Sequence, residues 1–386
     1  MTAVIADELT DIRRLAASVA NEVYGPIAQE LDATRTPVTQ VQREQLGELG
    51  FLGIAHDEKY GGAGAPFSHA LAVIEEFGKV CRPAAFQIFE ANTGPAQALA
   101  RLGTEEQRMR WLPDIIAGKK TMAVAISEPD AGSAATDMTT KAAAAGDGFL
   151  LNGTKRWISN GGEADLYLVY ARVSEAPGSR GIGALVVEST MPGVSFGVPE
   201  RLMGFRGIPS ADVILQDVVV PKENLIVQAG DFPKLFGAFS IERMGNATMS
   251  LAIGQAALDK SIQYVQERKQ FGKDIIDFQS IQTILADMLL QVESSRLLIE
   301  RAAKSVDEGL PNALHVSLAK CSANEMAKRV SDLAIQVHGG NGYTEEYGLE
   351  RLHRDSHGWA IAGGTPAMQR TRIVTELLGR RFDQRR

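Results

Sequence analysis

The sequence has few of the residues that disulfide-stabilised, metal-binding or membrane proteins need. Its 386 residues include two cysteines and six histidines. The cysteines, Cys81 and Cys321, lie far apart and have no metal-ligand or redox partner at motif spacing, so we expect two reduced thiols in the core. No apolar run reaches the roughly 18 residues that a membrane-spanning helix requires.

An excess of positive charge is also absent. The 40 lysine and arginine residues are outnumbered by 47 aspartate and glutamate residues, for a formal net charge of −7, which gives no basis for a nucleic-acid surface. The first 20 residues, "MTAVIADELTDIRRLAASVA", have acidic side chains and helical spacing and lack the continuous apolar segment of a signal peptide. We therefore expect a soluble, cytoplasmic protein.

Three zones differ in their pattern of apolar residues. In residues 1–118, apolar residues recur with the helical period, and turns such as "YGGAGAP" interrupt the pattern. Residues 119–228 contain short apolar stretches, such as "DLYLVYARV" and "GIGALVVE", separated by Gly, Pro, Asn and Asp, which predicts strands. In residues 229–386 the helical period returns in four segments: 235–268, 278–308, 313–339 and 366–380. The sequence predicts an α+β, mostly α protein with an N-terminal α-helical domain, a central β-barrel and a C-terminal four-helix bundle.

Two segments of the middle zone could bind a ligand. In "AISEPDAGS" (125–133), Pro129 and Gly132 predict an irregular loop whose N–H groups could hold an anion, although an ordinary polar turn has the same composition. In "NGTKRWISNGGEAD" (152–165), Trp157 and Ser159 follow a turn. A ring beside a hydroxyl group could stack on a flat cofactor and bond its edge, or the ring could belong to the core.

The third zone adds "ERKQFGK" (267–273) and "QVHGGNGYTEEYGLERLHRD" (336–355). Arg268 lies near the predicted end of a long helix, where an arginine can bond a phosphate or simply favour the helix C-terminus. The glycine-rich run 339–342 would let backbone approach a ligand closely.

These segments, with "MGFRG" and "DVVVPKENL" between them, follow one another in an order that resembles the acyl-CoA dehydrogenase family over nearly the whole chain. The resemblance implies the acyl-CoA dehydrogenase fold, one FAD per subunit and usually a homotetramer. It also implies an acyl thioester of CoA or of an acyl-carrier protein as substrate, and an electron-transfer flavoprotein as electron acceptor.

Matching positions carry the family's binding roles to particular residues of this chain. Those matched to the flavin of the same subunit are Val124, Ile126, Ser127, Trp157, Ser159, Thr365 and Gln369. Those matched to the FAD of the neighbouring subunit or to the loop over its adenine half are Arg268, Phe271, Gln279, Gln336 and Gly340. Those matched to the substrate thioester and its surroundings are Ser133, Phe239, Arg243 and Gly364.

The chain departs from the family pattern at two places. Ala134 stands where the family usually has Asp, which puts some hydrogen bonding to the thioester arm in doubt. Most members read Tyr-Glu-Gly-Thr where residues 362–365 here read Ala-Gly-Gly-Thr, so the glutamate that serves as catalytic base is missing. Removal of a proton α to a thioester still requires a base within hydrogen-bond reach.

Glu242 in "GAFSIERMGNATM" is the first candidate for that base. In isovaleryl-CoA and long-chain relatives the base comes from this helix, and Glu242 matches its position, with Arg243 as the arginine beside it. Most helix glutamates are solvated, yet no cation lies three or four residues from Glu242. An unpaired glutamate among small or apolar neighbours is consistent with a raised pKa or an absent ligand.

Glu90 in "FQIFEANTG" is the alternative base, because this segment lines the far end of the acyl pocket in the family. The simpler interpretation, which we favour, is a polar residue before the turn at Gly94-Pro95. The i,i+4 pair His353 and His357 has no third ligand nearby, so we expect surface or interface residues and no metal site.

The loop without its glutamate still has a backbone N–H at Gly363. Family precedent implies that this N–H donates to the thioester carbonyl, which stabilises the developing enolate. Ala362 and Gly363 also leave room for a substrate with bulk near the reacting carbons, so we expect a branched or cyclic acyl group. Other possibilities are a member with altered chemistry (a carrier-protein-bound acyl dehydrogenase, an oxidase or a desulfinase) and a redox-silent scaffold that contains FAD.

Overall fold

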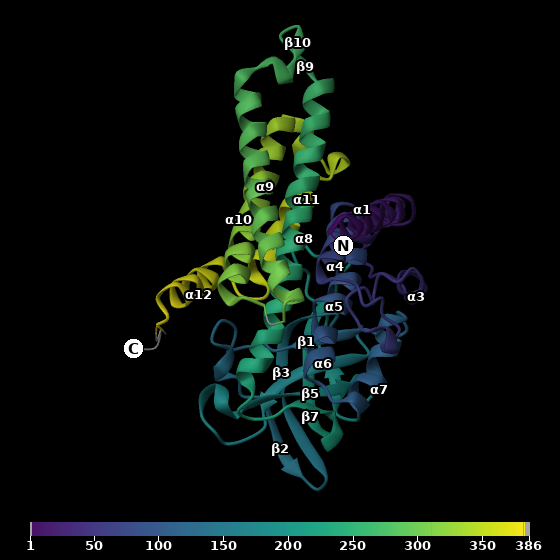
Figure 1. Cartoon of the computed structure of the whole chain (residues 1–386), viewed down its shortest axis with the longest axis vertical. Helices are drawn as coiled ribbons and strands as arrows, with labels where there is room; N and C mark the ends of the chain where they lie inside the picture. Colours follow the sequence, from purple (N-terminus) through teal and green to yellow (C-terminus); the bar gives the residue numbers. More distant parts are fainter. Residues whose placement is uncertain (1, 310, 381, 383–386) are drawn as a thin grey trace.

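A computed structural model describes residues 2–309, 311–380 and 382. A long bundle of helices forms one half of the molecule, a curved sheet lies at one end of it, and the N-terminal helices pack beside both (Figure 1). This arrangement confirms the predicted fold class. Of the described helices, none combines the length and the apolar character needed to cross a bilayer.

The N-terminal region is helical. Its α-helices are α1 (Thr2–Val19), α2 (Gly25–Thr34), α3 (Gln40–Glu48), α4 (Phe67–Val80), α5 (Arg82–Asn92), α6 (Pro95–Leu102) and α7 (Glu105–Ile116). Every residue of α5 is buried, because this helix lies between its own region and the C-terminal helices. Glu90 is therefore carried into the interior by an element with no solvent face.

The middle region forms one eight-stranded sheet with the order β6-β7-β3-β2-β4-β5-β8, and β1 pairs with β4 in parallel. Its strands are β1 (Met122–Ala125), β2 (Lys141–Ala145), β3 (Gly148–Ser159), β4 (Leu166–Arg172), β5 (Ile182–Glu188), β6 (Val194–Phe196), β7 (Ser210–Pro221) and β8 (Leu225–Val227). The pairing of β3 with β7 slips between Lys155 and Ile158, and Trp157 has a φ of 63° inside this irregularity. The bulge re-aims Trp157 away from the regular alternation of the strand.

The C-terminal region contains the four expected helices as α8 (Phe232–Glu267), α9 (Gln279–Asp307), α10 (Ala313–His338) and α12 (Pro366–Leu378). It also contains α11 (Leu349–Ile361), which the sequence pattern did not predict. Two short strands, β9 (Lys269–Gln270) and β10 (Lys273–Asp274), lie at the tip of the bundle, at the opposite end from the sheet (Figure 1). Both cysteines are free and buried.

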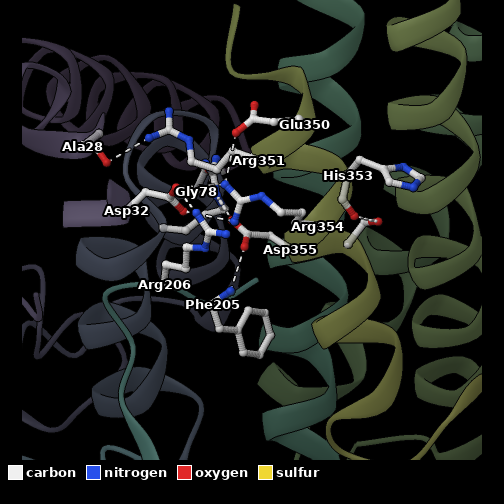
Figure 2. Close-up of polar contacts among 12 residues, drawn as sticks. Ala28, Asp32, Gly78, Phe205, Arg206, Glu350, Arg351, His353, Arg354 and Asp355 are labelled. Atoms are coloured by element: carbon white, nitrogen blue, oxygen red, sulfur yellow. Dashed lines mark hydrogen bonds and ion pairs between the residues drawn. The ribbon is translucent and has the colours of Figure 1, made fainter. Parts of the chain in front are cut away.

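Helix α11 joins the three regions through a cluster of charged groups (Figure 2). The carboxylate of Asp355 accepts hydrogen bonds from Arg82 of α5 and from the N–H of Phe205, the latter at 2.8 Å. Arg354 pairs with Asp32 of α2 at 2.8 Å. Because α11 leads directly into residues 362–365, this cluster also fixes where that loop begins.

Candidate active site

The loop at residues 362–365 is a sharp link between two helices. Helix α11 ends at Ile361, and Ala362 is extended. Gly363 and Gly364 have φ values of 67° and 92°, in the region that glycine tolerates best. Thr365 then caps α12 by accepting a hydrogen bond from Met368 N at 3.4 Å, and a proline opens the helix. The sequence "AGGTP" is thus a helix stop, a turn and a helix start.

Three successive carbonyl groups of this loop accept hydrogen bonds from α8 and α10. Asn246 Nδ2 donates to Ala362 O at 3.3 Å, and Arg243 Nε donates to Gly363 O at 3.1 Å. Lys320 Nζ donates to Gly364 O at 3.0 Å. We call Arg243, Asn246 and Lys320 the loop cradle.

The loop cradle determines where the N–H groups point. A trans peptide holds its C=O and N–H on opposite sides, and no described peptide is cis. The bond from Asn246 to Ala362 O therefore turns the N–H of Gly363 away from the cradle, and the bond to Gly363 O does the same for the N–H of Gly364. None of these cradle bonds uses either N–H, so both remain oriented for an acceptor on the other side.

Glu242 lies on α8 next to this loop and is not paired. Among the described residues, none of the ion pairs or hydrogen bonds includes its carboxylate. Water can reach part of the side chain, which is only partly buried. The surrounding protein nevertheless raises the pKa of Glu242 to about 8 by desolvation, against the lowering effect of Arg243 and Lys320.

Arg243, predicted to be near the substrate, is buried in the loop cradle. Its guanidinium lies 4.5 Å from the ring centre of Phe236 and 4.8 Å from that of Phe239. Burial, and then Arg372, lower the pKa of Arg243 to about 9, while Glu242 raises it. The buried Nη1 atom has no hydrogen-bond partner among the described residues.

Glu90 faces the same region from α5. Its side chain is 8% exposed, and its Oε2 atom has no hydrogen-bond partner. Burial, and then the charge of Glu242, hold the pKa of Glu90 well above its ordinary value. Glu90 also lines a cavity of about 20 Å³ with Gln87 and Lys120, which has room for about one water molecule. Both candidate bases therefore have pKa values raised above the ordinary value of a carboxyl, chiefly by burial.

Sequence reasoning missed several residues of this site. Lys320 is fully buried and bonds Asn324 Oδ1 at 2.8 Å, and Asn324 in turn donates to Asn246 Oδ1 at 2.9 Å and Ser250 Oγ at 2.8 Å. Tyr170 of β4 is also buried, and its pKa is raised by burial and then by Glu242. A polar pair at i,i+4 on an otherwise apolar helix face was the available signal for Lys320 and Asn324.

The residues matched to the flavin lie where β1 ends and β3 bulges. Lys155 Nζ donates to Ile126 O at 3.0 Å and Arg156 N donates to Ser127 O at 2.8 Å, which ties the two segments together. Val124 and Ser159 are partly buried beside them. The indole of Trp157 is 53% exposed, with the guanidinium of Arg156 at 4.6 Å from its ring. An exposed aromatic plane at a strand bulge fits a flat ring such as a flavin.

The residues matched to the neighbouring subunit's FAD lie at the tip of the bundle. A cavity of about 530 Å³ lies there, lined in part by Arg268, Phe271, Gln336 and Gly340. Gln279 is the first residue of α9. The Phe271 ring is 92% exposed, and a Cβ added to Gly340 would meet nothing within 4 Å. The volume suits a nucleotide-sized ligand.

The structure does not bring these two groups together within one chain, because the sheet and the bundle tip lie at opposite ends of the molecule (Figure 1). The remaining two residues matched to the flavin, Thr365 and Gln369, lie apart from both groups at the start of α12. The amide of Gln369 donates to Gly364 O at 3.0 Å. Ser133 is exposed in the loop after β1. His353 bonds Ser331 Oγ at 3.1 Å, and the described residues contain no group of three side chains suited to a metal ion.

Comparison with known proteins gives the family directly. The chain matches the acyl-CoA dehydrogenase N-terminal domain over residues 6–119, the middle domain over 123–218 and the C-terminal domain over 233–378. It is 37% identical over 369 residues to the Caffeyl-CoA reductase-Etf complex subunit CarC of Acetobacterium woodii, covering 95% of this chain and 97% of that protein. It is 37% identical over 391 residues to the 3-sulfinopropanoyl-CoA desulfinase of Paraburkholderia xenovorans, covering 98% and 99%.

Among solved structures, the butyryl-CoA dehydrogenase of Megasphaera elsdenii superposes with a TM-score of 0.93 at 33% identity, covering 96% of this chain and 98% of that one. The chain belongs to the acyl-CoA dehydrogenase family. It is accordingly an FAD-dependent oxidoreductase acting on CH–CH bonds of acyl-CoA substrates.

Proposed function

We propose that this protein carries out α,β-dehydrogenation of an acyl thioester, with Glu242 as the base at the α carbon. The observation that carries the proposal is the unpaired carboxyl of Glu242, on the helix that also bonds two carbonyl groups of the loop. A thioester oxygen bonded to the N–H of Gly363 would lie over this loop, with its α carbon within reach of the Glu242 side chain.

The residues of the chain divide the work of proton removal. Ionised Glu242 accepts the α proton, and the N–H of Gly363 donates to the thioester oxygen as negative charge develops on it. Loss of one such donor costs roughly 2.7–4 kcal/mol in comparable sites. The residues around Trp157 and those at the bundle tip would hold FAD, which would supply the acceptor for the two electrons and the β hydrogen.

Reduction of an enoyl thioester is the second candidate, favoured by the similarity to a caffeyl-CoA reductase subunit. The same groups serve both directions, because protonated Glu242 can return a proton to the α carbon. Burial raises the pKa of Glu242 to about 8, so both protonation states are populated near neutral pH.

We propose a branched or cyclic acyl group as the preferred substrate. Ala362 and Gly363 carry no large side chain, so the loop itself does not limit bulk near the reacting carbons. Each well-placed methylene is worth about 1–3 kcal/mol of discrimination, so a bulky acyl group should be favoured at least about tenfold in kcat/KM over a straight chain.

We further propose that an electron-transfer flavoprotein exchanges electrons with the bound FAD, as the name of the Acetobacterium relative indicates for that protein. The assembly that we propose is a homotetramer. The reason for proposing an assembly is that the two groups of residues matched to FAD lie at opposite ends of a chain. The bundle tip of a second copy would then complete the FAD site of the first.

Anaerobic bleaching of the flavin absorbance tests the function. Isovaleryl- and cyclohexanecarbonyl-CoA should bleach it faster than butyryl-, hexanoyl- or octanoyl-CoA, and the matching carrier-protein thioesters would identify the carrier. Absence of bleaching by every thioester would indicate a redox-silent scaffold. Rapid reoxidation by oxygen would indicate an oxidase, and release of sulfite from 3-sulfinopropanoyl-CoA a desulfinase.

A further inference from the structure

Lys320 is a buried lysine without a carboxylate partner. Its side chain is fully buried, and no ion pair of the described residues includes it. Its Nζ atom donates to two neutral oxygens, Asn324 Oδ1 at 2.8 Å and Gly364 O at 3.0 Å. A buried ammonium group held only by neutral acceptors is costly, so its retention at this position needs a reason.

The position of Lys320 supplies that reason. It lies beneath the loop at residues 362–365, and a Cβ added to Gly363 would come within 3.3 Å of Lys320 Cε. The lysine therefore supports the peptide groups opposite the side on which a thioester would lie. It is also near enough to Glu242 for the two charges to affect each other.

We propose that Lys320 is a positioning residue of the reaction: it fixes the Gly364 carbonyl from beneath the loop, and its ammonium charge favours the ionised form of Glu242. This inference rests on the proposed role of Glu242 as base. Because Lys320 is fully buried beneath the loop, it would act through the loop and through the carboxylate.

Other charged and titratable groups face this pair from the surrounding elements. Glu90 of α5 and Tyr170 of β4 face Glu242, Arg243 of α8 faces both members, and Cys321 adjoins Lys320 on α10. Arg372 of α12 acts on Arg243. Burial, and then Arg243, lower the pKa of Lys320 to about 7, while Glu242 raises it. Ionisation of Glu242 therefore favours the ammonium form of Lys320, and the ammonium in turn favours the carboxylate.

Two substitutions separate the charge of Lys320 from its hydrogen bond. Lys320→Gln keeps an N–H donor near Gly364 O without the charge, and Lys320→Met removes both. The exposed Lys222 offers a matched control, Lys222→Met, outside the site.

The measurement is α-hydrogen exchange with deuterium in 3,3-dimethylbutanoyl-CoA, using the holoenzyme. This thioester has no β hydrogen, so it cannot be dehydrogenated and reports proton removal alone. We expect the acidic limb of the exchange rate against pH to move about one unit higher in both Lys320 variants, which is about tenfold slower exchange at pH 7. Lys320→Gln should approach the wild-type rate at high pH, whereas Lys320→Met should remain below it.

The outcomes are distinguishable. Unshifted pH profiles in both variants, with FAD content and melting temperature equal to wild type, would overturn the inference. Lower FAD content and melting temperature with an unshifted profile would also overturn it, because that is the result of a purely structural lysine. Wild-type protein that exchanges no α hydrogen in any thioester would instead contradict the proposed function of Glu242.

Discussion

At the scale of single residues, Glu242 and Glu90 are two carboxyls that compete for one role. Both are unpaired and both have a raised pKa. Glu242 adjoins the loop that would receive the thioester oxygen and remains partly accessible, whereas Glu90 is more deeply buried on α5. The base must reach the α carbon, so position favours Glu242.

We expect Glu242→Gln to lower kcat by about 10²–10⁴-fold while FAD and thioester binding persist, since an amide cannot accept the α proton. The measurement is single-turnover flavin reduction by the preferred thioester. Glu90→Gln is the matched control and should keep kcat within about tenfold of wild type. The reverse pattern would assign the base to α5.

The pH dependence of kcat/KM should follow the same carboxyl. Burial raises the pKa of Glu242 to about 8, and only its ionised form is a base. For dehydrogenation, kcat/KM should therefore rise with pH up to about pH 8 and level off above it. A profile that is already flat from pH 5 upward would contradict a raised pKa for Glu242. In the direction of reduction the dependence should be opposite, because the protonated form is then the donor.

The same group predicts an effect on stability. A carboxyl whose pKa is raised by folding costs stability as pH rises from its unfolded value through about 8, because the unfolded chain gains more from ionisation. Glu242→Gln should therefore melt at a higher temperature than wild type at pH 9. This advantage should disappear near pH 4.5. Differential scanning calorimetry of both proteins with FAD bound measures it, and an equal difference at both pH values would contradict the buried charge.

At the scale of the elements, the site depends on how α8, α10 and the loop at 362–365 interlock. Asn246 of α8 donates to Trp359 O at 3.1 Å and to Ala362 O, the last turn of α11 and the first residue of the loop. It also accepts from Asn324 of α10. The side-chain amide of Asn246 thus fixes the positions of α8, α10 and the end of α11 relative to one another.

Asn246→Ala should leave the buried carbonyl of Trp359 without this donor, and it should take one of two acceptors from the buried Asn324 amide. Each unsatisfied group costs about 1–3 kcal/mol, so we expect the free energy of unfolding to fall by at least about 2 kcal/mol. Urea unfolding followed by circular dichroism measures it. Gln263→Ala on the exposed part of α8 is the control and should stay within about 0.5 kcal/mol of wild type. Equal stability of the two variants would refute this role for Asn246.

At the scale of the whole molecule, the charged cluster around Asp355 fixes the regions relative to one another (Figure 2). Asp355 accepts from Arg82 of the N-terminal region and from Phe205 N of the middle region, and lies itself in the C-terminal region. Arg82 and Asp355 are both nearly fully buried. Removing one member of a buried pair leaves an uncompensated charge, which costs about 3–5 kcal/mol.

Asp355→Asn should therefore destabilise the protein by roughly 3 kcal/mol or more and lower its melting temperature. Glu346→Gln, an exposed change close by in the sequence, should have almost no effect. Thermal unfolding of the three proteins decides it. Limited proteolysis adds a second readout, because cleavage near residue 205 should accelerate in Asp355→Asn if the regions separate.

Purified protein should be yellow, with one FAD per chain, and its FAD content should depend on assembly. Because the two groups of residues proposed to bind FAD lie at opposite ends of a chain, dilution to monomer should release FAD. Analytical ultracentrifugation with detection at protein and flavin wavelengths measures both. Arg268→Ala should lower FAD content without moving Trp157, and a monomer that retains full FAD would contradict a site shared between chains.

The fold class could be predicted from the sequence, and so could the order of the segments that match the family's FAD-binding motifs. Four of the five C-terminal helices could be predicted from their apolar period, and glycines and prolines marked the turns between strands. Helix α11 was not predicted because several of its residues are charged. Two of them, Arg354 and Asp355, form ion pairs with the N-terminal region, and the sequence does not show these pairs. Its apolar residues keep the helical spacing, but they are few among charged and polar neighbours, so the segment resembles a polar connection in the sequence.

The surroundings of the loop that lacks the family glutamate could be seen only once the chain was folded. The departure at residues 362–365 and the candidacy of Glu242 and Glu90 could be read from sequence, but the loop cradle could not. Asn246 and Lys320 are separated from the loop by 116 and 44 residues, respectively. Burial and charge at Glu242 arise only when α5, α8, α10 and β4 converge on it. A pKa depends on desolvation and on neighbouring charges in space, and a sequence specifies neither until the chain is packed.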